Sequence, residues 1–296
     1  MDLATFLIQC LNSLQYGLLL FLVASGLTLI FGIMGVINLA HGSFYMIGAY
    51  MAFALAPLVA GTLGGGFFST MAVGVVLAVI LGYVLEWAFF SFLYEREHLQ
   101  QVLMTYGLIL VFEELRSMLV GDDVHGVQAP EFLSGTLPLG DLMTYPVYRL
   151  FISFVCLLLA LGMYLVFTRT RLGMMIRAGS TGPVQREMVQ SLGIDIKFLY
   201  RVVFAAGVAI AVLAGMVAAP VSSVYPGMGN SVLIICFVVV VIGGIGSIKG
   251  ALVAALLIGA VDTFGKVLLP EMAGVLVYVM MALILLWKPD GLFRAA

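Results

Sequence analysis

The densest group of polar side chains that could handle a solute lies inside an otherwise apolar stretch, residues 32–50. The group comprises Asn38, His41, Ser43 and Tyr45, interspersed with Gly32, Gly35, Gly42 and Gly48. Glycines allow a helix to break, and the freed backbone amides and carbonyls can face a polar solute where lipid is excluded. The four polar side chains are therefore candidates to line a solute path. The alternative is that Asn38 and His41 hydrogen-bond a neighbouring helix and hold the bundle together.

Patterns typical of catalysis are absent from the sequence. His41, His98 and His125 are scattered and lack the spacing of metal ligands. The sequence has no GxSxG, HExxH or GxxxxGK[ST] motif, so it has no phosphate loop with which to bind ATP. We therefore expect a protein that is not an enzyme and binds no metal or cofactor of its own. Any ATP and magnesium that drive it must be bound by a separate subunit.

Composition identifies the solvent around most of this chain as lipid. Hydrophobic residues make up 63% of the 296 residues and charged residues only 9%, and the mean hydropathy is +1.19. Soluble domains carry about 25% charged residues, so this chain cannot cover a water-facing surface of normal size. Continuous apolar runs favour helices, since each helix satisfies its own backbone groups. The predicted fold is an all-α, polytopic membrane helical bundle of about 8–9 transmembrane helices, forming a single domain over residues 1–296.

The predicted helices follow the apolar runs of the sequence. These runs are 4–31, 34–56, 67–93, 100–120, 149–168, 202–220, 231–247, 250–268 and 273–287. An uncharged turn at 32–36 separates the first two, so a broken or re-entrant helix near 32–48 is an alternative to two complete spans. A re-entrant half-helix there would move the N-terminus to the other side of the membrane.

The distribution of basic residues predicts the orientation of the bundle. Six of the thirteen basic residues lie in 169–201, and none lies before Arg96. Basic residues concentrate in short cytosolic loops, so we expect 169–201 to be cytosolic, the N-terminus to be outside and 121–148 to form an irregular external loop. Within the cytosolic loop, Pro183 could begin and Gly193 end a short amphipathic helix. Such a helix would dock a partner protein; the alternative is an ordinary solvated loop.

Other polar residues in the apolar runs have structural interpretations. Asp262 and Lys266 are four residues apart and could form an ion pair on one helix face, as could Glu113 and Arg116. Glu86 is expected near the inner interface of the membrane. Small-residue spacing at 242–251 favours close helix packing.

Three ordered motifs resemble a known family. Residues 26–42, GLTLIFGIMGVINLAHG, closely resemble the N-terminal signature of permease subunits of the branched-chain amino acid type of ABC importer. Residues 243–251, GGIGSIKGA, resemble the C-terminal signature of that family. Between them, 176–195 resembles the cytosolic coupling loop that contacts the ATPase, except that Gln185 stands where relatives more often carry an acidic residue. The matching positions that imply ATPase coupling are Arg177, Gln185, Arg186, Glu187, Met188 and Gly193.

The resemblance implies a membrane subunit of an ATP-driven importer in a bacterial cytoplasmic membrane. It also implies two ATP-binding subunits, a second homologous permease subunit and a periplasmic substrate-binding protein as partners, and no nucleic acid. The implied solute is a branched-chain or related amino acid. Similar systems carry urea, short amides and aromatic carboxylates, which remain alternatives. An ion-coupled secondary transporter or a channel is a further alternative, although residues 3–85 contain none of the deep charges that it would need.

Overall fold

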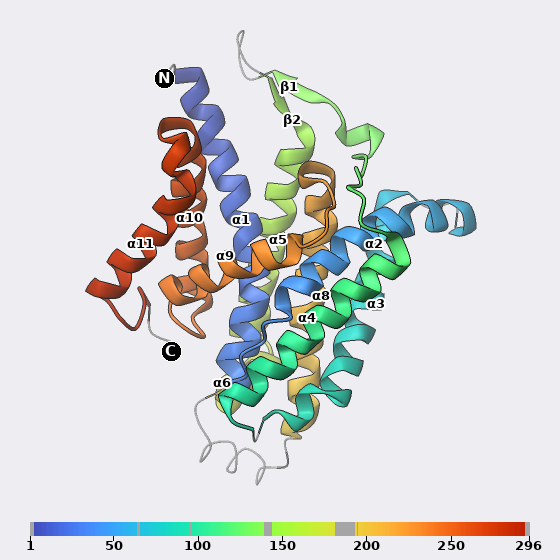
Figure 1. The fold of residues 1–296 in the computed structure, drawn as a ribbon, viewed down its shortest axis with the longest axis vertical. Coiled ribbons are helices and arrows are strands. Elements are labelled where there is room, and N and C mark those ends of the chain that lie inside the picture. Colours follow the sequence, from blue (N-terminus) through green and yellow to red (C-terminus); the bar gives the residue numbers. More distant parts are fainter. Residues whose placement is uncertain are drawn as a thin grey trace.

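The computed structural model describes residues 3–63, 66–94, 96–138, 144–180, 193 and 195–293. These residues form a helical bundle with one small hairpin (Figure 1). The elements are α1 (Leu3–Met34), α2 (His41–Leu63), α3 (Phe67–Ala88), η1 (Phe90–Phe92), α4 (His98–Val120), η2 (Glu131–Leu133), β1 (Thr136–Pro138), β2 (Thr144–Pro146), α5 (Val147–Arg169), α6 (Arg171–Ser180), α8 (Ile196–Ser222), α9 (Met228–Gly243), α10 (Ile248–Leu268), η3 (Pro270–Met272) and α11 (Ala273–Trp287).

Each of the nine predicted apolar runs contains an α-helix. Within the described part of the chain, seven helical segments are long and apolar enough to cross a membrane: α1, α2, α3 with η1, α5, α8, α10, and η3 with α11. The helix α9 has 16 residues and is about 24 Å long, which is shorter than the ~30 Å hydrocarbon core. The helix α4 has sufficient length but carries Glu113, Glu114 and Arg116. The predicted polytopic, all-α membrane bundle is confirmed.

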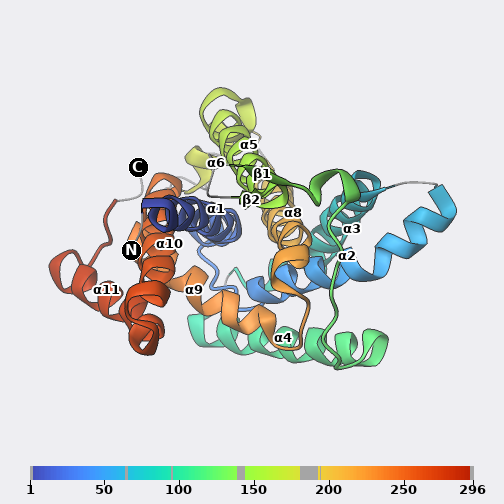
Figure 2. The same ribbon diagram turned by 90° about the horizontal axis from the view of Figure 1, so that it is seen from above.

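The helices α1 and α8 occupy the middle of the bundle. Viewed from above, α10 and α11 lie on one side of α1, whereas α2 and α3 lie beyond α8 (Figure 2). Burial follows this arrangement: 83% of the most apolar window of α1 and 78% of that of α8 are buried, against 11% for α11. The outer helices therefore present apolar surface to lipid, while α1 and α8 contact mainly other helices.

Glycines allow the central helices to approach each other closely. A Cβ atom added to Gly26 of α1 would lie 2.7 Å from the carbonyl oxygen of Gly207 in α8, and one on Gly259 of α10 would lie 2.7 Å from Cα of Gly17 in α1. Such small-residue contacts bring backbones together where no hydrophobic driving force acts between helices in lipid. The same holds for Gly243 of α9, where an added Cβ would lie 2.5 Å from the carbonyl carbon of Gly250, so the packing interpretation of 242–251 is confirmed.

The described part of the external loop is more regular than expected. Strands β1 and β2 pair antiparallel, with Thr136 opposite Pro146 and Pro138 opposite Thr144. The expectation of an irregular segment is therefore wrong for the hairpin, because proline is tolerated in a two-stranded ribbon whose outer edges need no donor. It holds for 121–135, where η2 is the one helical turn and no strand forms. Farther back, His125 and Val224 exchange two backbone hydrogen bonds of 2.8 Å, which tie this loop to the connection between α8 and α9.

The hairpin and the start of α1 lie at one end of the bundle, and α6 lies at the other (Figure 1). This arrangement agrees with a chain whose N-terminus and 121–148 loop share one side. Which of the two ends faces the cytosol stays a prediction from the basic residues, and we refer to the hairpin end as the outer end.

Candidate functional site

The connection between α1 and α2 turns back into the bundle. Helix α1 ends at Met34, and Gly35 follows with a φ of 68°, a left-handed conformation that favours glycine. Helix α2 then begins at His41, whose Nε2 lies 2.9 Å from the carbonyl oxygen of Val23. Val23 precedes the end of α1 by eleven residues, or about 16 Å along the helix axis. The break expected near 32–48 is therefore present, and α2 starts deep inside the bundle.

The four predicted solute-path residues are all buried, but they lie in different surroundings. Asn38 and His41 are fully buried, and both bond to backbone: Asn38 Oδ1 accepts from the amide of Ala40 at 3.0 Å, and His41 contacts Val23. Ser43 is 3% exposed and Tyr45 is 4% exposed. Of the four, only Tyr45 lines the main cavity described below. The contacts of Asn38 and His41 favour the interpretation that they hold the α1–α2 connection.

The larger described cavity lies between the outer ends of the central helices and has a volume of about 660 Å³. The N-terminal half of α1, the C-terminal ends of α8 and α10 and the start of α9 supply most of its walls, and α2 and α5 supply one residue each. The lining residues are Gln9, Asn12, Gln15, Tyr16, Leu19, Tyr45, Arg149, Ala218, Val221, Ser222, Tyr225, Met228, Ser231, Val232, Ile235, Asp262, Thr263, Lys266 and Val267. A cavity of this size, part polar and part aliphatic, suits a small amphipathic solute.

Three charged side chains reach this cavity. Lys266 Nζ lies 2.6 Å from Asp262 Oδ2, so the predicted ion pair is confirmed; the Lys266 side chain is 63% exposed and that of Asp262 is 15% exposed. Lys266 also lies over the ring of Tyr16, with 5.6 Å from Nζ to the ring centre. Arg149 Nη1 donates to the amide oxygen of Asn12 at 2.6 Å.

The sequence of α1 contains a pattern of polar residues that marks one wall of this cavity. Gln9, Asn12 and Tyr16 stand at positions i, i+3 and i+7, which place them on one face of α1. Because the surrounding run is strongly apolar, a hydropathy window averages this polar face away. The pairing of Asp262 with Lys266 was predictable, but its position beside residues of α1 depends on tertiary packing.

A second polar cluster was not predicted, and it lies near the opposite end of the bundle. Glu86 of α3 is fully buried, with its carboxylate 3.1 Å from Nε of Arg201 in α8 and accepting a short hydrogen bond from the Tyr94 hydroxyl. Glu86 is therefore enclosed by protein, and its expected position near the inner interface of the membrane stays a prediction. Its pairing with a residue 115 positions away replaces contact with water.

The predicted coupling residues are only partly described. Arg177 belongs to α6, a helix that follows α5 and packs against α5, α1 and α8. Gly193 has a φ of 85°, a conformation typical of a residue that ends a helix. Gln185, Arg186, Glu187 and Met188 lie outside the described residues, as does nearly all of the helix predicted for 183–193. After this region, α8 begins at Ile196 with Asp195 as its cap, whose Oδ1 accepts from the Phe198 amide at 3.1 Å.

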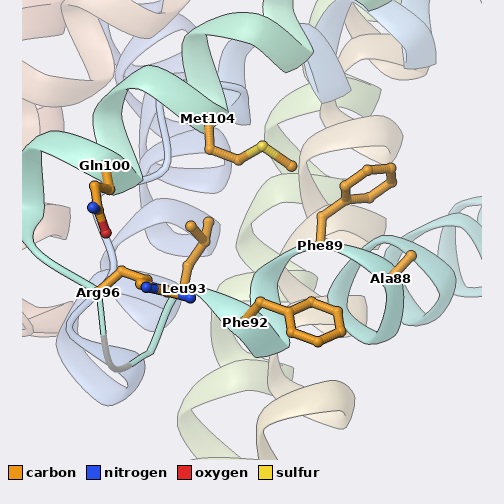
Figure 3. A pocket seen from close by; sticks show the side chains of 7 residues that line it. All are labelled: Ala88, Phe89, Phe92, Leu93, Arg96, Gln100 and Met104. Carbon is orange, nitrogen blue, oxygen red and sulfur yellow. The ribbon is translucent and has the colours of Figure 1, made fainter.

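A smaller hollow of about 310 Å³ lies beside the connection between α3 and α4 (Figure 3). Its lining residues are Ala88, Phe89, Phe92, Leu93, Arg96, Gln100 and Met104. Apart from Arg96 and Gln100 this lining is apolar, so the hollow suits hydrocarbon better than a polar solute. The neighbouring Gln101 bridges two connections: its Oε1 accepts from the Ile37 amide at 3.3 Å, and its Nε2 donates to the carbonyl oxygen of Leu93 at 3.1 Å.

Comparison with known families identifies the class of protein. Residues 9–285 match the family model described as "Branched-chain amino acid transport system / permease component". The chain belongs to this family. The permease is 28% identical to the high-affinity branched-chain amino acid transport system permease protein BraD of Pseudomonas aeruginosa, over 97% of this chain and 95% of the relative.

Further relatives agree in length and description. The permease is 27% identical to the high-affinity branched-chain amino acid transport system permease protein LivH of Escherichia coli K12, over 97% of this chain and 95% of the relative. It is 28% identical to the probable branched-chain amino acid transport permease protein LivH of Methanocaldococcus jannaschii, over 84% of this chain and 77% of the relative. No solved structure matches the chain significantly.

Family membership confirms several predictions. The chain is a multi-pass membrane protein and the permease component of an ABC transport system, homologous to bacterial permeases of the same type. Such a component is a non-catalytic membrane subunit and is not known to bind a cofactor. It implies an ATPase and a substrate-binding protein as partners.

Proposed function

We propose that this permease imports a branched-chain or closely related amino acid across a bacterial cytoplasmic membrane, driven by ATP hydrolysis in separate subunits. The match of residues 9–285 to a branched-chain amino acid permease family carries this proposal. The cavity between α1, α8, α9 and α10 supports it, because polar and aliphatic side chains line the same space. Tyr45 connects the predicted polar cluster to this path.

The complete importer would contain two ATP-binding subunits, a second homologous permease subunit and a periplasmic substrate-binding protein. The segment 169–201 would receive the ATPase through Arg177, Gln185, Arg186, Glu187, Met188 and Gly193. Helix α8 supports this arrangement, because it starts within that segment, at Ile196, and ends at the cavity, where Ala218 and Ser222 belong to the lining. Its 27 residues make a rod about 40 Å long.

This geometry suggests how ATPase movement would reach the solute. A helix packed on several neighbours moves as a rigid element, so a displacement at Ile196 would shift the cavity wall at the other end of α8. ATP-driven closure of the ATPases would thereby favour one of two access states, which requires that the ATPases contact those states differently.

Urea, short amides and aromatic carboxylates are the alternative solutes for the same mechanism. The rival mechanism, an ion-coupled transporter or channel acting alone, is disfavoured by the family match to a component of a multi-part system.

The test is uptake by the permease reconstituted in proteoliposomes with its ATPases, its partner permease and its binding protein. Labelled leucine, urea and benzoate serve as solutes. We expect leucine uptake that requires ATP and stops when the binding protein is omitted. Uptake of urea or benzoate without leucine would refute the substrate, and leucine uptake by the permease alone along an ion gradient would refute the mechanism.

A further inference from the structure

We propose that the 660 Å³ cavity is a binding site within the permease for an α-amino acid in its zwitterionic form. In this site Asp262 receives the ammonium group, and Arg149 receives the carboxylate. The inference rests on the proposed function and extends it, because it names the side chains that recognise the two charged ends of the solute.

Asp262 is the acidic member of the site. It lies two turns before the end of α10, in a helix apolar enough to span the membrane, where a carboxylate needs a partner. Its partner in the structure is Lys266, whose ammonium group lies 2.6 Å away at the exposed end of a flexible side chain. A solute ammonium can replace the Lys266 ammonium without changing the charge around Asp262. Lys266 can then turn away from Asp262, because its side chain is 63% exposed.

Arg149 is the basic member. Its guanidinium donates to the neutral amide of Asn12, and the Tyr145 hydroxyl lies 3.1 Å from the same Asn12 oxygen. Among the described residues, Arg149 forms no ion pair with a carboxylate. A guanidinium of this kind can bind a solute carboxylate through two parallel hydrogen bonds.

Helix α1 brings the two charged centres onto one face. Arg149 contacts Asn12, and Lys266 lies over the ring of Tyr16, the residue four positions later. Side chains at i and i+4 of a helix are neighbours, about 5–6 Å apart at Cβ. The Asp262–Lys266 pair and Arg149 therefore line the same cavity next to neighbouring positions of α1. In the proposed site one small zwitterion contacts both.

The rest of the lining selects among the possible solutes. Leu19, Val232 and Ile235 supply aliphatic surface, and the volume lies within the ~300–1,000 Å³ typical of small-molecule sites. Urea has no charged group to pair with Asp262 or Arg149. An aromatic carboxylate would satisfy Arg149 but would bring a second anion toward Asp262. An aliphatic amino acid matches all three parts of the cavity.

The experiment measures binding of labelled leucine to the purified transporter complex in nanodiscs without the binding protein, together with ATP-driven uptake in proteoliposomes. We expect Asp262→Asn and Arg149→Gln each to weaken leucine binding by about tenfold or more, as loss of one charge-assisted hydrogen bond does. Lys266→Gln should bind leucine as tightly as the unaltered complex or more tightly, because it removes the competing ammonium. Asp122→Asn is the matched control, since Asp122 is an exposed carboxylate that lies outside the cavity lining.

Analogues that lack one charge identify which residue contacts which end. Leucinamide lacks the carboxylate and 4-methylpentanoate lacks the ammonium group, so Asp262→Asn should reduce the preference for leucine over 4-methylpentanoate. Arg149→Gln should reduce the preference for leucine over leucinamide. These ratios are measured within one variant and do not depend on how much protein assembles.

Two results would overturn the inference while leaving the proposed function intact. One is leucine binding and uptake that Asp262→Asn and Arg149→Gln leave unchanged. The other is equal weakening by Asp262→Asn and Lys266→Gln, which would make the ion pair a structural element only. ATP-driven uptake of urea or benzoate without leucine would instead overturn both proposals. If Asp262→Asn does not assemble, Lys266→Gln and the analogue ratios of Arg149→Gln still decide the outcome.

Discussion

The buried ion pair between Glu86 and Arg201 should make an asymmetric contribution to stability. The side chain of Glu86 is 1% exposed, whereas that of Arg201 is 25% exposed and its guanidinium lies 5.8 Å from the centre of the Tyr83 ring. Replacing Arg201 by Gln therefore leaves a carboxylate deep between α3 and α8 that still accepts a hydrogen bond from the Tyr94 hydroxyl. Replacing Glu86 by Gln leaves a guanidinium that can still reach solvent and the aromatic ring.

The expected magnitudes follow from these exposures. Removing one partner of a buried pair costs about 3–5 kcal/mol when the other charge remains uncompensated. Because Arg201 is partly exposed, we expect the lower end, about 3 kcal/mol, for Arg201→Gln. For Glu86→Gln we expect about 1 kcal/mol, the net value of one hydrogen bond. The double variant should resemble Glu86→Gln alone, so the two effects fall short of additivity by about 3 kcal/mol.

The measurement is a double-mutant cycle on the free energy of unfolding in mixed detergent micelles. Lys197→Gln is the control, because Lys197 is an exposed basic residue one turn earlier on the same helix. It should change stability by less than about 0.5 kcal/mol, as surface substitutions do. Equal costs for Glu86→Gln and Arg201→Gln, or strict additivity in the double variant, would refute the asymmetry and the burial on which it depends.

Three further substitutions test other parts of the structure. Gly48→Ala should destabilise the bundle by about 1–3 kcal/mol in the same unfolding assay, since a Cβ there would overlap the carbonyl oxygen of Val212, whereas Gly61→Ala, with nothing within 4 Å, should be neutral or slightly stabilising. His41→Ala should lower melting temperature and uptake together, because His41 holds the start of α2 against Val23; loss of uptake at unchanged stability would instead put His41 on the solute path. Arg186→Glu combined with Glu187→Arg should uncouple ATP hydrolysis from uptake while the subunits still co-purify, and unchanged uptake would remove these residues from the ATPase contact.

Much of the fold was predictable because few backbone conformations are stable in lipid. A spanning segment must satisfy its backbone internally, so each long apolar run had to become a helix, and all nine contain one. The break before α2 was also visible in the sequence, where Gly32, Gly35 and Asn38 interrupt an apolar run. Hydropathy could not predict how deep α2 begins; the structure shows this by the contact between His41 and Val23 and by the full burial of His41.

The polar sites were harder to predict because they join residues far apart in the sequence. Spacing alone identified the Asp262–Lys266 pair, since both residues lie on one helix. No local pattern connects Glu86 with Arg201 or Asn12 with Arg149, which are 115 and 137 positions apart. The polar cluster at 38–45 was the most prominent in the sequence, yet its Asn38 and His41 bond to backbone, and the cavity draws on α1 and α10 instead.

Helix α8 links the buried ion pair, the close contact with α1 and the cavity. Near its first turns, Arg201 is held to α3 by Glu86; at its middle, Gly207 allows close contact with α1; at its last turns, Ser222 lines the cavity. Because Glu86 fixes the start of α8 to α3, a displacement of the proposed coupling segment would be carried by α3 and α8 together. Breaking the Glu86–Arg201 pair should therefore affect coupling as well as stability. The ATP hydrolysed per leucine imported should rise in Glu86→Gln even where the protein remains folded, and an unchanged ratio would limit the pair to a structural role.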